Sequence, residues 1–596
     1  MVKDVEVPQR GTAGRNAGVR AVALTTLLAL GVRLVCAYQS SRVPTARHLI
    51  GDAAGYYEWA QRIAAGDWIG GESFYQAPLY PYALAAWFSI AGDSVWTVRV
   101  VQAAWGAAAC GLLCWTAGKM FERRVGLVAG VMLAIYGPTV FFDGIVQKAS
   151  LSNLLICVML AVMSGGERCF RPARAALLGG TASLLCLVRE NAIVWHLVLC
   201  AWIAFGEPEA VRESEREGCG ADGGPAGSGV RVIRRAAWVG AYLAGAAIVL
   251  VPVGIRNARV GGEFSVTTFQ AGPNFYIGNH RGADGRYQPL VRGHETPAFE
   301  RRDATVLAQH DTGKTLTPRE VSRYWFWRAW EDVKEDPRGW LKLLGYKALL
   351  TWNRYEVADV ESIRVYRQAS SLLNVLCAAG HFGVIVPLAV IGAAATRRRW
   401  RRLWVYYLLI ISMAAAVAAF YVLGRYRYPI VPLLIPFAAA GCVHAWDLLR
   451  LRRWAEIAPL AILAVAAALV VNRPIQDERR LDALAEMNAG VALAESGDVR
   501  SATVLFRQAV AANPQSAEAN NNLAQALALQ GEFAEAIEYY RAALAIEPNL
   551  PSIHYNFGVA LERIGRVADA AEHYALAVQH DPHDNDARAA LERLSK

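Results

Sequence analysis

The residues of this sequence best placed to do chemistry are ionisable side chains at the ends of long apolar segments. The acids are Asp52, within "GDAAGYYEWAQRIAAGDW", and Asp143, within "VFFDGIVQKAS". The cations include Arg425 and Arg427, within "VLGRYRYPIVP". A carboxylate can accept a proton from a weak nucleophile, and arginines can hold an anion. We therefore predict that these residues share one polar site.

Further polar residues at segment ends extend this candidate site. Arg189 and Glu190 stand together in "LVRENAIVWH", and Glu58 follows Asp52 by six residues. Charges also collect at the ends of membrane segments because they cost less there than in the middle, but the division of this set into acids and arginines favours a site. The residues predicted to contact a substrate from the loops are Tyr57, Glu58, Glu190, Asn274 and Asn279.

The composition of the 596 residues is that of a membrane protein with a soluble tail. Hydrophobic residues make up 55% of the chain. Apolar stretches of about 17–25 residues, the length that spans a bilayer, recur up to residue 471. Residues 481–596 hold 8 Lys/Arg against 16 Asp/Glu, a net charge of −8, which leaves +18 on the first 480 residues. Such a basic excess indicates cytoplasmic loops and contact with membrane lipids, and we find no nucleic-acid-binding motif.

The basic clusters predict how the apolar segments cross the membrane. With the N-terminus in the cytoplasm, clusters such as "RVIRR" and "RRRWRR" all fall in cytoplasmic loops. This arrangement requires that 78–92, which contains Pro78 and Pro81, lies at membrane depth without crossing. The loops 39–97 and 256–370 and the tail then face outward. The eleven predicted spans are 19–38, 98–118, 125–141, 145–163, 174–188, 192–206, 236–255, 371–395, 403–423, 429–447 and 455–471.

Residues 481–596 contain a repeat with a period of 34 residues. Small residues let paired helices approach, an aromatic residue fills the layer between them, and a proline ends each unit. The pattern predicts an α-solenoid of three tetratricopeptide repeats, which normally binds extended peptides or another protein. Asn488, Asn522 and Asn556 either line a peptide groove or reflect ordinary repeat usage. The other matching positions are Gly490, Ala524 and Gly558; Gly497, Gly531 and Gly565; Ala502, Ala536 and Ala570; Phe506, Tyr540 and Tyr574; Ala509, Ala543 and Ala577; and Pro514, Pro548 and Pro582.

Several stretches together resemble the membrane-embedded GT-C glycosyltransferases, which include the protein O-mannosyltransferases and the aminoarabinose transferases. These stretches are "GDAAGYYEWAQRIAAGDW" with "APLYPYALAA", then "RRVGLVAGVMLAIYGPTVFFDGIVQKAS", and late in the chain "GRYRYPIVPLLIP". With its repeat tail the chain is also similar to the transmembrane and tetratricopeptide-containing O-mannosyltransferases. The resemblance implies an all-α, polytopic membrane domain over residues 1–471, with about 11 spans, followed by a repeat domain over residues 481–596.

The resemblance also implies roles for the candidate residues. In such enzymes the donor is a sugar linked to a polyprenyl phosphate, and the reaction inverts the anomeric centre. The first-loop acid of the family corresponds to Asp52, as the general base that activates an acceptor hydroxyl. The leaving lipid phosphate needs cations, and Arg425 and Arg427 are the first candidates. Asp143 takes the place of the family's second acid, where it would orient the acceptor, pair with an arginine or bind a metal. The further phosphate-binding candidates are Arg189 and Lys148.

One departure from the family and two rival functions stay open. Protein mannosyltransferases usually carry two adjacent first-loop acids, whereas Asp52 stands alone, so a divalent metal is only an open alternative as cofactor. A polytopic transporter would be expected to show inverted repeats, and a non-catalytic scaffold would need far fewer spans. We expect a multi-pass protein of the cytoplasmic membrane, with the repeat domain outside, that glycosylates a protein or envelope acceptor on the outer face.

Overall fold

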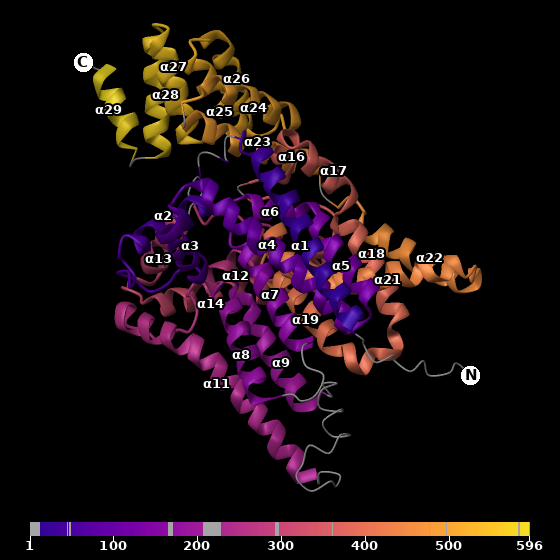
Figure 1. Ribbon diagram of the computed structural model, residues 1–596. Coiled ribbons are helices and arrows are strands. Elements are labelled where there is room, and N and C mark those ends of the chain that lie inside the picture. The colour runs from indigo at the N-terminus through magenta and orange to yellow at the C-terminus, as the bar shows by residue number, and fades with distance from the viewer. Residues whose placement is uncertain are drawn as a thin grey trace. The chain divides into compact units, whose positions relative to one another are not determined.

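The computed structural model is helical throughout the part of the chain that it describes, and it contains no strand there (Figure 1). This confirms the all-α fold predicted from the sequence. The described residues are 12–43, 46, 49, 51–164, 171–206, 228–291, 297–359, 361–475, 477–495, 497–581 and 584–594.

The described helices include seven that are long and apolar enough to cross a membrane, or eight if a bent pair forms one span. The bent pair is α5 (Arg123–Ile135) and α6 (Gly137–Gly144), which meet at 52°. Pro138 lies in the first turn of the second helix, where its missing backbone N–H costs no helical hydrogen bond. Each of the eleven predicted spans contains a helix, but three of the spans (145–163, 174–188 and 192–206) fall outside the long helices and the bent pair, and their helices have only 16, 15 and 12 residues.

Small residues let the membrane helices pack closely. Helices α8 (Pro172–Cys186) and α11 (Ser228–Gly261) lie side by side (Figure 1). A Cβ atom on Gly179 or Gly245 would come within 2.0 Å of a backbone oxygen of the other helix, which is the close approach that glycine permits in membrane bundles. The remaining helices of this part are α1 (Thr12–Ser40), α4 (Val95–Met120), α7 (Ala149–Ser164), η2 (Glu190–Ile193), α9 (Val194–Phe205), α17 (Ser371–Ala379), α18 (Phe382–Ala395), η3 (Arg397–Arg399), α19 (Trp400–Ala419), α20 (Gly424–Arg427), η4 (Tyr428–Ile430), α21 (Val431–Arg450) and α22 (Trp454–Val471).

The two long loops predicted to face outward fold into short helices. The first loop forms α2 (Gly51–Ala64) and α3 (Leu79–Ala91), and α3 has only 13 residues. In the second loop, Thr317 and Glu320 form a capping box at the start of α14, and Asp336 caps the next helix. The helices of the second loop are α12 (Ala271–Asn279), α13 (Pro297–Thr312), α14 (Pro318–Glu335), α15 (Pro337–Trp352) and α16 (Ile363–Ala369).

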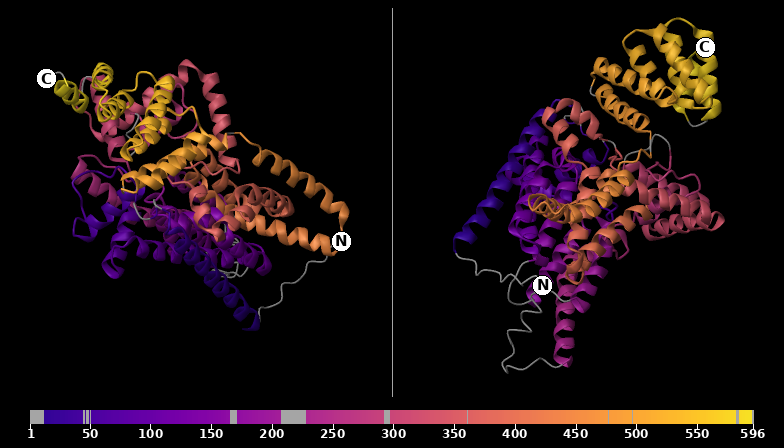
Figure 2. Two further views of the ribbon diagram at one scale, coloured as in Figure 1. Left: turned by 90° about the horizontal axis from the view of Figure 1, so that it is seen from above. Right: turned by 90° about the vertical axis from the view of Figure 1, so that its right-hand side faces the viewer.

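The tail consists of consecutive helix pairs followed by one further helix (Figure 2). The glycine of a first helix faces the aromatic ring of its partner: a Cβ atom on Gly490 would lie 2.6 Å from Phe506, and one on Gly558 would lie 2.7 Å from Tyr574. Pro582 lies outside the described residues. The helices are α23 (Glu478–Glu495), α24 (Val499–Ala512), α25 (Ala517–Leu529), α26 (Phe533–Ile546), α27 (Pro551–Arg563), α28 (Val567–His580) and α29 (Asn585–Leu594).

The chain forms two compact units whose boundary near residue 473 falls close to the predicted domain boundary. The first unit comprises residues 1–39, 51–356 and 370–473, and the second comprises 40–50, 357–369 and 474–596. Two short segments therefore belong with the repeats, although the sequence predicts them as part of the membrane domain. Arg364 of α16, for example, forms an ion pair with Glu486 of α23, with 3.9 Å between Nε and Oε1.

Candidate active site

Asp52 lies in the first turn of α2 and is held by two side chains from other segments. One carboxylate oxygen accepts a hydrogen bond from Gln76 Nε2 at 2.9 Å, and the other accepts a hydrogen bond from Arg425 within an ion pair. Burial alone would raise the pKa of Asp52, but the charge and hydrogen bond of Arg425, together with the charge of Lys148, hold this pKa below its usual value. Asp52 is therefore ionised at neutral pH.

Arg425 reaches Asp52 from α20, the short helix that leads through η4 into α21. The residue is only 8% exposed, and its guanidinium lies 5.1 Å from the centre of the Tyr426 ring. The guanidinium fork that binds a carboxylate also binds the oxygens of a phosphate. A phosphate that enters this site would compete with Asp52 for Arg425.

Arg189 is a buried cation without a hydrogen-bond partner among the described residues. It is 3% exposed, and all three of its guanidinium nitrogens lack a partner. Its guanidinium carbon lies 5.6 Å from the centre of the Tyr426 ring, the same ring that Arg425 contacts. An uncompensated buried charge costs several kcal/mol, so the arrangement calls for an anion from outside the chain.

Lys148 and Glu190 complete this group of charges. Lys148 is 6% exposed, and its Nζ lies 5.7 Å from the centre of the Tyr56 ring. Lys148 is within electrostatic reach of Asp52, Glu190 and both arginines. Glu190 accepts hydrogen bonds from Gln270 at 2.8 Å and from Thr268 at 3.4 Å.

The three cations of this charge cluster exceed its two carboxylates by one positive charge. The cations are Lys148, Arg189 and Arg425, and the carboxylates are Asp52 and Glu190. A phosphodiester carries one negative charge and would balance the cluster. The cluster is therefore suited to bind a phosphodiester in a place where water does not screen charge.

Arg427 has other partners, although it stands two residues from Arg425. It forms an ion pair with Glu356 at 2.8 Å and donates to the backbone oxygens of Asn353 and Tyr355. Its guanidinium also lies 4.5 Å from the centre of the Phe382 ring. These contacts tie Arg427 to residues 353–356. Its guanidinium is therefore less able than that of Arg425 to bind a phosphate.

Asp143 lies apart from Asp52, in a separate ion pair between membrane helices. Its Oδ2 accepts a hydrogen bond from Arg33 Nε of α1 at 2.6 Å, and both side chains are buried. Gln102 Nε2 donates to the Asp143 backbone oxygen at 3.2 Å. The sequence leaves three roles open for Asp143: to orient the acceptor, to pair with an arginine or to bind a metal. In the structure Asp143 is paired with Arg33.

The loop residues predicted to contact a substrate have different surroundings. Glu58 is exposed on α2, and the Tyr57 ring packs 5.3 Å from Phe88. Asn274 accepts a hydrogen bond from Tyr421 at 3.1 Å. Asn279 is buried and links backbone and side-chain groups: it donates to the backbone oxygens of Phe275 and Ala419 and accepts from Trp340 and Lys347. Of these, only Glu190 belongs to the charge cluster.

Glu300, in the first turn of α13, is a carboxyl of this region that the sequence analysis missed. It accepts a hydrogen bond from the Tyr75 hydroxyl at 3.0 Å and a weaker one from the Tyr287 hydroxyl at 3.5 Å. Burial raises the pKa of Glu300 to about 7, and the negative charge of Asp52 acts in the same direction. The hydrogen bonds of the two tyrosines and the charge of Arg425 oppose the rise.

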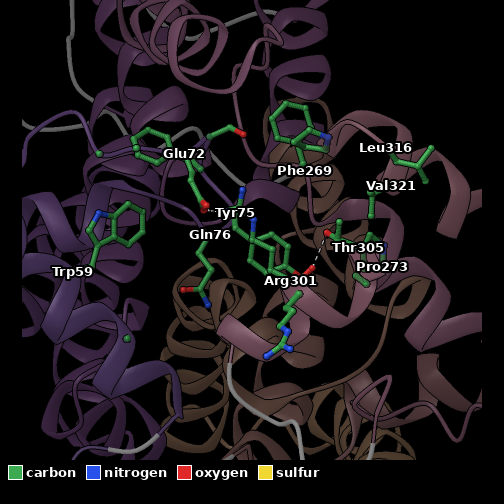
Figure 3. Close-up of a pocket in the computed structure, with 18 of the residues that line it drawn as sticks. Trp59, Glu72, Tyr75, Gln76, Phe269, Pro273, Arg301, Thr305, Leu316 and Val321 are labelled. Carbon is green, nitrogen blue, oxygen red and sulfur yellow. Dashed lines mark hydrogen bonds and ion pairs between the residues drawn. The ribbon is translucent and has the colours of Figure 1, made fainter. Parts of the chain in front are cut away.

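A cavity of about 760 Å³ lies between the first outer loop and α13. Tyr75 and Gln76 line it, between Trp59 on one side and Arg301 and Thr305 on the other (Figure 3). This volume is within the range of small-molecule sites. Aromatic and arginine side chains in the lining suit a polar ligand with a flat face, such as a sugar or part of a peptide.

The described residues contain no group of three or more His, Cys, Asp or Glu side chains arranged to hold a metal ion. Asp52 has Gln76 and Arg425 as its hydrogen-bond partners instead of a second carboxylate.

The repeated asparagines of the tail lie on the first helices of successive pairs. All three are partly buried. Asn556 Nδ2 donates to Asn521 Oδ1 at 3.2 Å, and Asn521 Nδ2 donates to Asn522 Oδ1 at 3.4 Å. This hydrogen-bonded row joins two neighbouring repeats, and a peptide groove there stays a prediction.

Comparison with known proteins confirms the repeats. Two family profiles, both described as tetratricopeptide repeat, match residues 487–551 and 527–594. A similar solved structure is that of YrrB, described as a TPR protein with an unusual peptide-binding site. It has 16% sequence identity and a TM-score of 0.18, over 39% of this chain and all of that one. Among curated proteins, none matches the chain.

Similar solved structures that cover more than two thirds of the chain include an oligosaccharyltransferase and ArnT. The Archaeoglobus fulgidus oligosaccharyltransferase in the apo form has 15% identity and a TM-score of 0.43, over 80% of this chain and 57% of that one. ArnT from Cupriavidus metallidurans, bound to undecaprenyl phosphate, has 18% identity and a TM-score of 0.32, over 72% and 79%. The chain thus spans little more than half of the oligosaccharyltransferase. Similarity at this level identifies no residue role.

Proposed function

We propose that the protein is an inverting glycosyltransferase that moves a sugar from a polyprenyl-phosphate-linked donor to a protein or envelope acceptor. The observation that carries this proposal is the charge cluster, in which Arg425 is paired with Asp52 while the buried Arg189 has no hydrogen-bond partner among the described residues. The cluster has one positive charge in excess, which matches the single negative charge of a phosphodiester donor. The residues that gave the resemblance to GT-C enzymes include both Asp52 and Arg425.

Each group of the cluster has a chemical task in this transfer. The oxygen of the acceptor hydroxyl bonds to the anomeric carbon while the bond from that carbon to the phosphate oxygen breaks. The electron pair leaves with the lipid phosphate, whose added negative charge Arg425, Arg189 and Lys148 stabilise. A hydroxyl is a poor nucleophile, so a carboxylate must draw its proton away, and Asp52 is the first candidate for this base. When the phosphate binds Arg425, the ion pair between Arg425 and Asp52 would break and leave the Asp52 carboxylate free.

The repeat unit would recruit the acceptor or a protein partner. Tetratricopeptide stacks bind peptides and proteins on an extended surface, and Asn488, Asn522 and Asn556 are the candidate contacts. The basic clusters of the sequence favour a multi-pass arrangement in the cytoplasmic membrane, with donor and acceptor meeting on the outer face. The sugar and the acceptor are left for experiment to identify.

Transfer in purified vesicles tests the proposed activity. The full-length protein would be reconstituted without a membrane potential and given a panel of radiolabelled polyprenyl-phosphate-linked hexoses and pentoses. Envelope material from a strain that lacks the protein would serve as acceptor. We expect label from one donor to enter the acceptor. Uptake of free sugar into the vesicles without any transfer would instead support the transporter alternative.

A further inference from the structure

Two consecutive residues connect the cavity to two different carboxyl groups. Tyr75 and Gln76 both line the cavity. The Gln76 side chain donates to Asp52 at 2.9 Å, and the Tyr75 hydroxyl donates to Glu300 at 3.0 Å. Figure 3 shows Tyr75 and Gln76 near one another in the cavity. A hydroxyl group bound beside them would therefore lie next to hydrogen bonds that lead to both carboxyls.

The two carboxyls differ in their ability to keep a proton. Asp52 is paired with Arg425, and its pKa lies below the usual value, so it is a weak base. Among the described residues, Glu300 forms no such ion pair, and it faces the hydroxyls of Tyr75 and Tyr287. A general base works best when its pKa lies near the working pH, and the pKa of about 7 places Glu300 in that range.

A purely structural role for Glu300 does not explain its burial or its two tyrosine partners. An acid in the first turn of a helix stabilises the helix dipole, and Glu300 occupies such a position in α13. A carboxylate with that role alone would face solvent, and its pKa would tend to fall. Glu300 is instead partly buried, with one tyrosine from the first outer loop and one from its own loop on its two oxygens.

The geometry points to Glu300 as the group that finally takes the proton of the acceptor hydroxyl, with Tyr75 as the hydroxyl between them. This inference rests on the proposed glycosyl transfer and names a further residue for it. As the acceptor oxygen attacks the anomeric carbon, its proton moves to the Tyr75 oxygen while the Tyr75 proton moves to Glu300. The carboxylate becomes neutral as the departing lipid phosphate gains its second negative charge.

The inference predicts how the rate depends on pH. Glu300 must be ionised to accept a proton, so the rate should rise with pH through its pKa of about 7. The ionised fraction of such a group increases roughly tenfold between pH 6 and pH 8. The other groups that face Glu300 are the hydroxyls of Tyr75, Tyr287 and Tyr421 and the charges of Asp52 and Arg425. Asp52 is ionised throughout this range, so as the sole base it would give a flat profile.

The test is the pH–rate profile of the full-length protein in vesicles, with the radiolabelled donor panel and envelope acceptor described above. We expect a roughly tenfold rise from pH 6 to pH 8 in the wild type. Glu300→Gln keeps the size of the side chain but cannot take a proton, and should lower the rate by about 10²–10⁴-fold and flatten the profile. Glu300→Asp should recover part of the rate together with its pH dependence.

Matched variants separate this role from damage to the fold. Glu335→Gln changes an exposed acid of the same loop and should behave as the wild type. Tyr75→Phe should resemble Glu300→Gln, whereas Tyr287→Phe, at the weaker hydrogen bond, should keep the pH dependence. A flat wild-type profile, or a rise that persists in Glu300→Gln, would overturn the role of Glu300 but leave the glycosyl transfer standing. Absence of all donor-dependent transfer would overturn both.

Discussion

Arg425 donates a hydrogen bond to Asp52, although 373 residues separate the two in the sequence. The pair joins a group able to hold a phosphate to a group able to draw a proton from an acceptor. While they are paired, each reduces the other's reactivity. Binding of a lipid phosphate to Arg425 would free Asp52, so the acceptor would be activated only when the donor is present.

This competition predicts that transfer and lipid binding respond differently to Asp52→Asn. Transfer should fall by about 10²–10⁴-fold because the carboxylate is lost. Affinity for undecaprenyl phosphate should stay the same or rise, because the competitor for Arg425 is weaker. Both quantities would be measured on the reconstituted protein. Asp93→Asn, at an exposed acid that accepts a hydrogen bond from Gln61, is the control, and a large loss of lipid affinity in Asp52→Asn would contradict the competition.

Removal of Arg425 should lower the affinity for the lipid phosphate. Truncation of one partner of a buried, hydrogen-bonded charge pair costs about 2–5 kcal/mol, which corresponds to an affinity loss of roughly 30-fold or more. We therefore expect Arg425→Ala to weaken undecaprenyl phosphate binding to this extent. Titration of the lipid into the purified protein would measure it, with Arg338→Ala at an exposed position of α15 as control. An unchanged affinity would exclude Arg425 from the donor site.

Arg189 and Arg427 form a matched pair for a stability test. Arg189 has no partner among the described residues, so Arg189→Met should leave thermal stability unchanged or raise it, while the protection given by undecaprenyl phosphate is lost. Arg427→Met would leave the partly buried Glu356 without its cation and the backbone oxygens of Asn353 and Tyr355 without their donor, and should cost about 3–5 kcal/mol. Thermal unfolding with and without the lipid measures both effects. If Arg189→Met were less stable than Arg427→Met, Arg189 would be the structural arginine, and its assignment to the phosphate site would be wrong.

Deletion of residues 481–596 tests recruitment by the repeats. The spans should still insert and bind undecaprenyl phosphate, but modification of a protein acceptor should decrease because the acceptor is no longer held nearby. Mass spectrometry of envelope proteins from cells with each version would measure the change. The double variant Asn522→Ala/Asn556→Ala spares the packed core of the repeats and should give a smaller decrease. Undiminished modification after the deletion would remove the recruitment role.

Much of the fold follows from patterns that act over short distances. Runs of apolar residues mark the membrane helices, and the 34-residue period marks the repeats because each unit packs only against its neighbours. The three short helices of 16, 15 and 12 residues within predicted spans show the limit of this reasoning. Hydropathy locates an apolar segment, but the length of its helix depends on how the chain turns at each end.

The candidate site could be predicted only in part, because side-chain direction and distant contacts decide it. Arg425 and Arg427 are equivalent candidates in the sequence, yet residues two apart on a helix point to nearly opposite sides, and only Arg425 meets Asp52. Glu300 stands among charged residues of a polar helix, where no spacing distinguishes it. Its partner Tyr75 is 225 residues away, so only the folded chain reveals the contact.

Sugar transfer by this chain, and the need for Asp52 in that transfer, can be tested together in cells. The most direct measurement compares the glycans on envelope proteins and lipids in a deletion strain, restored with either the wild type or Asp52→Asn. We predict that one glycan disappears on deletion and returns only with the wild type. Return of that glycan with Asp52→Asn would contradict the role of Asp52. Identical glycans in all strains would contradict the assignment as a glycosyltransferase.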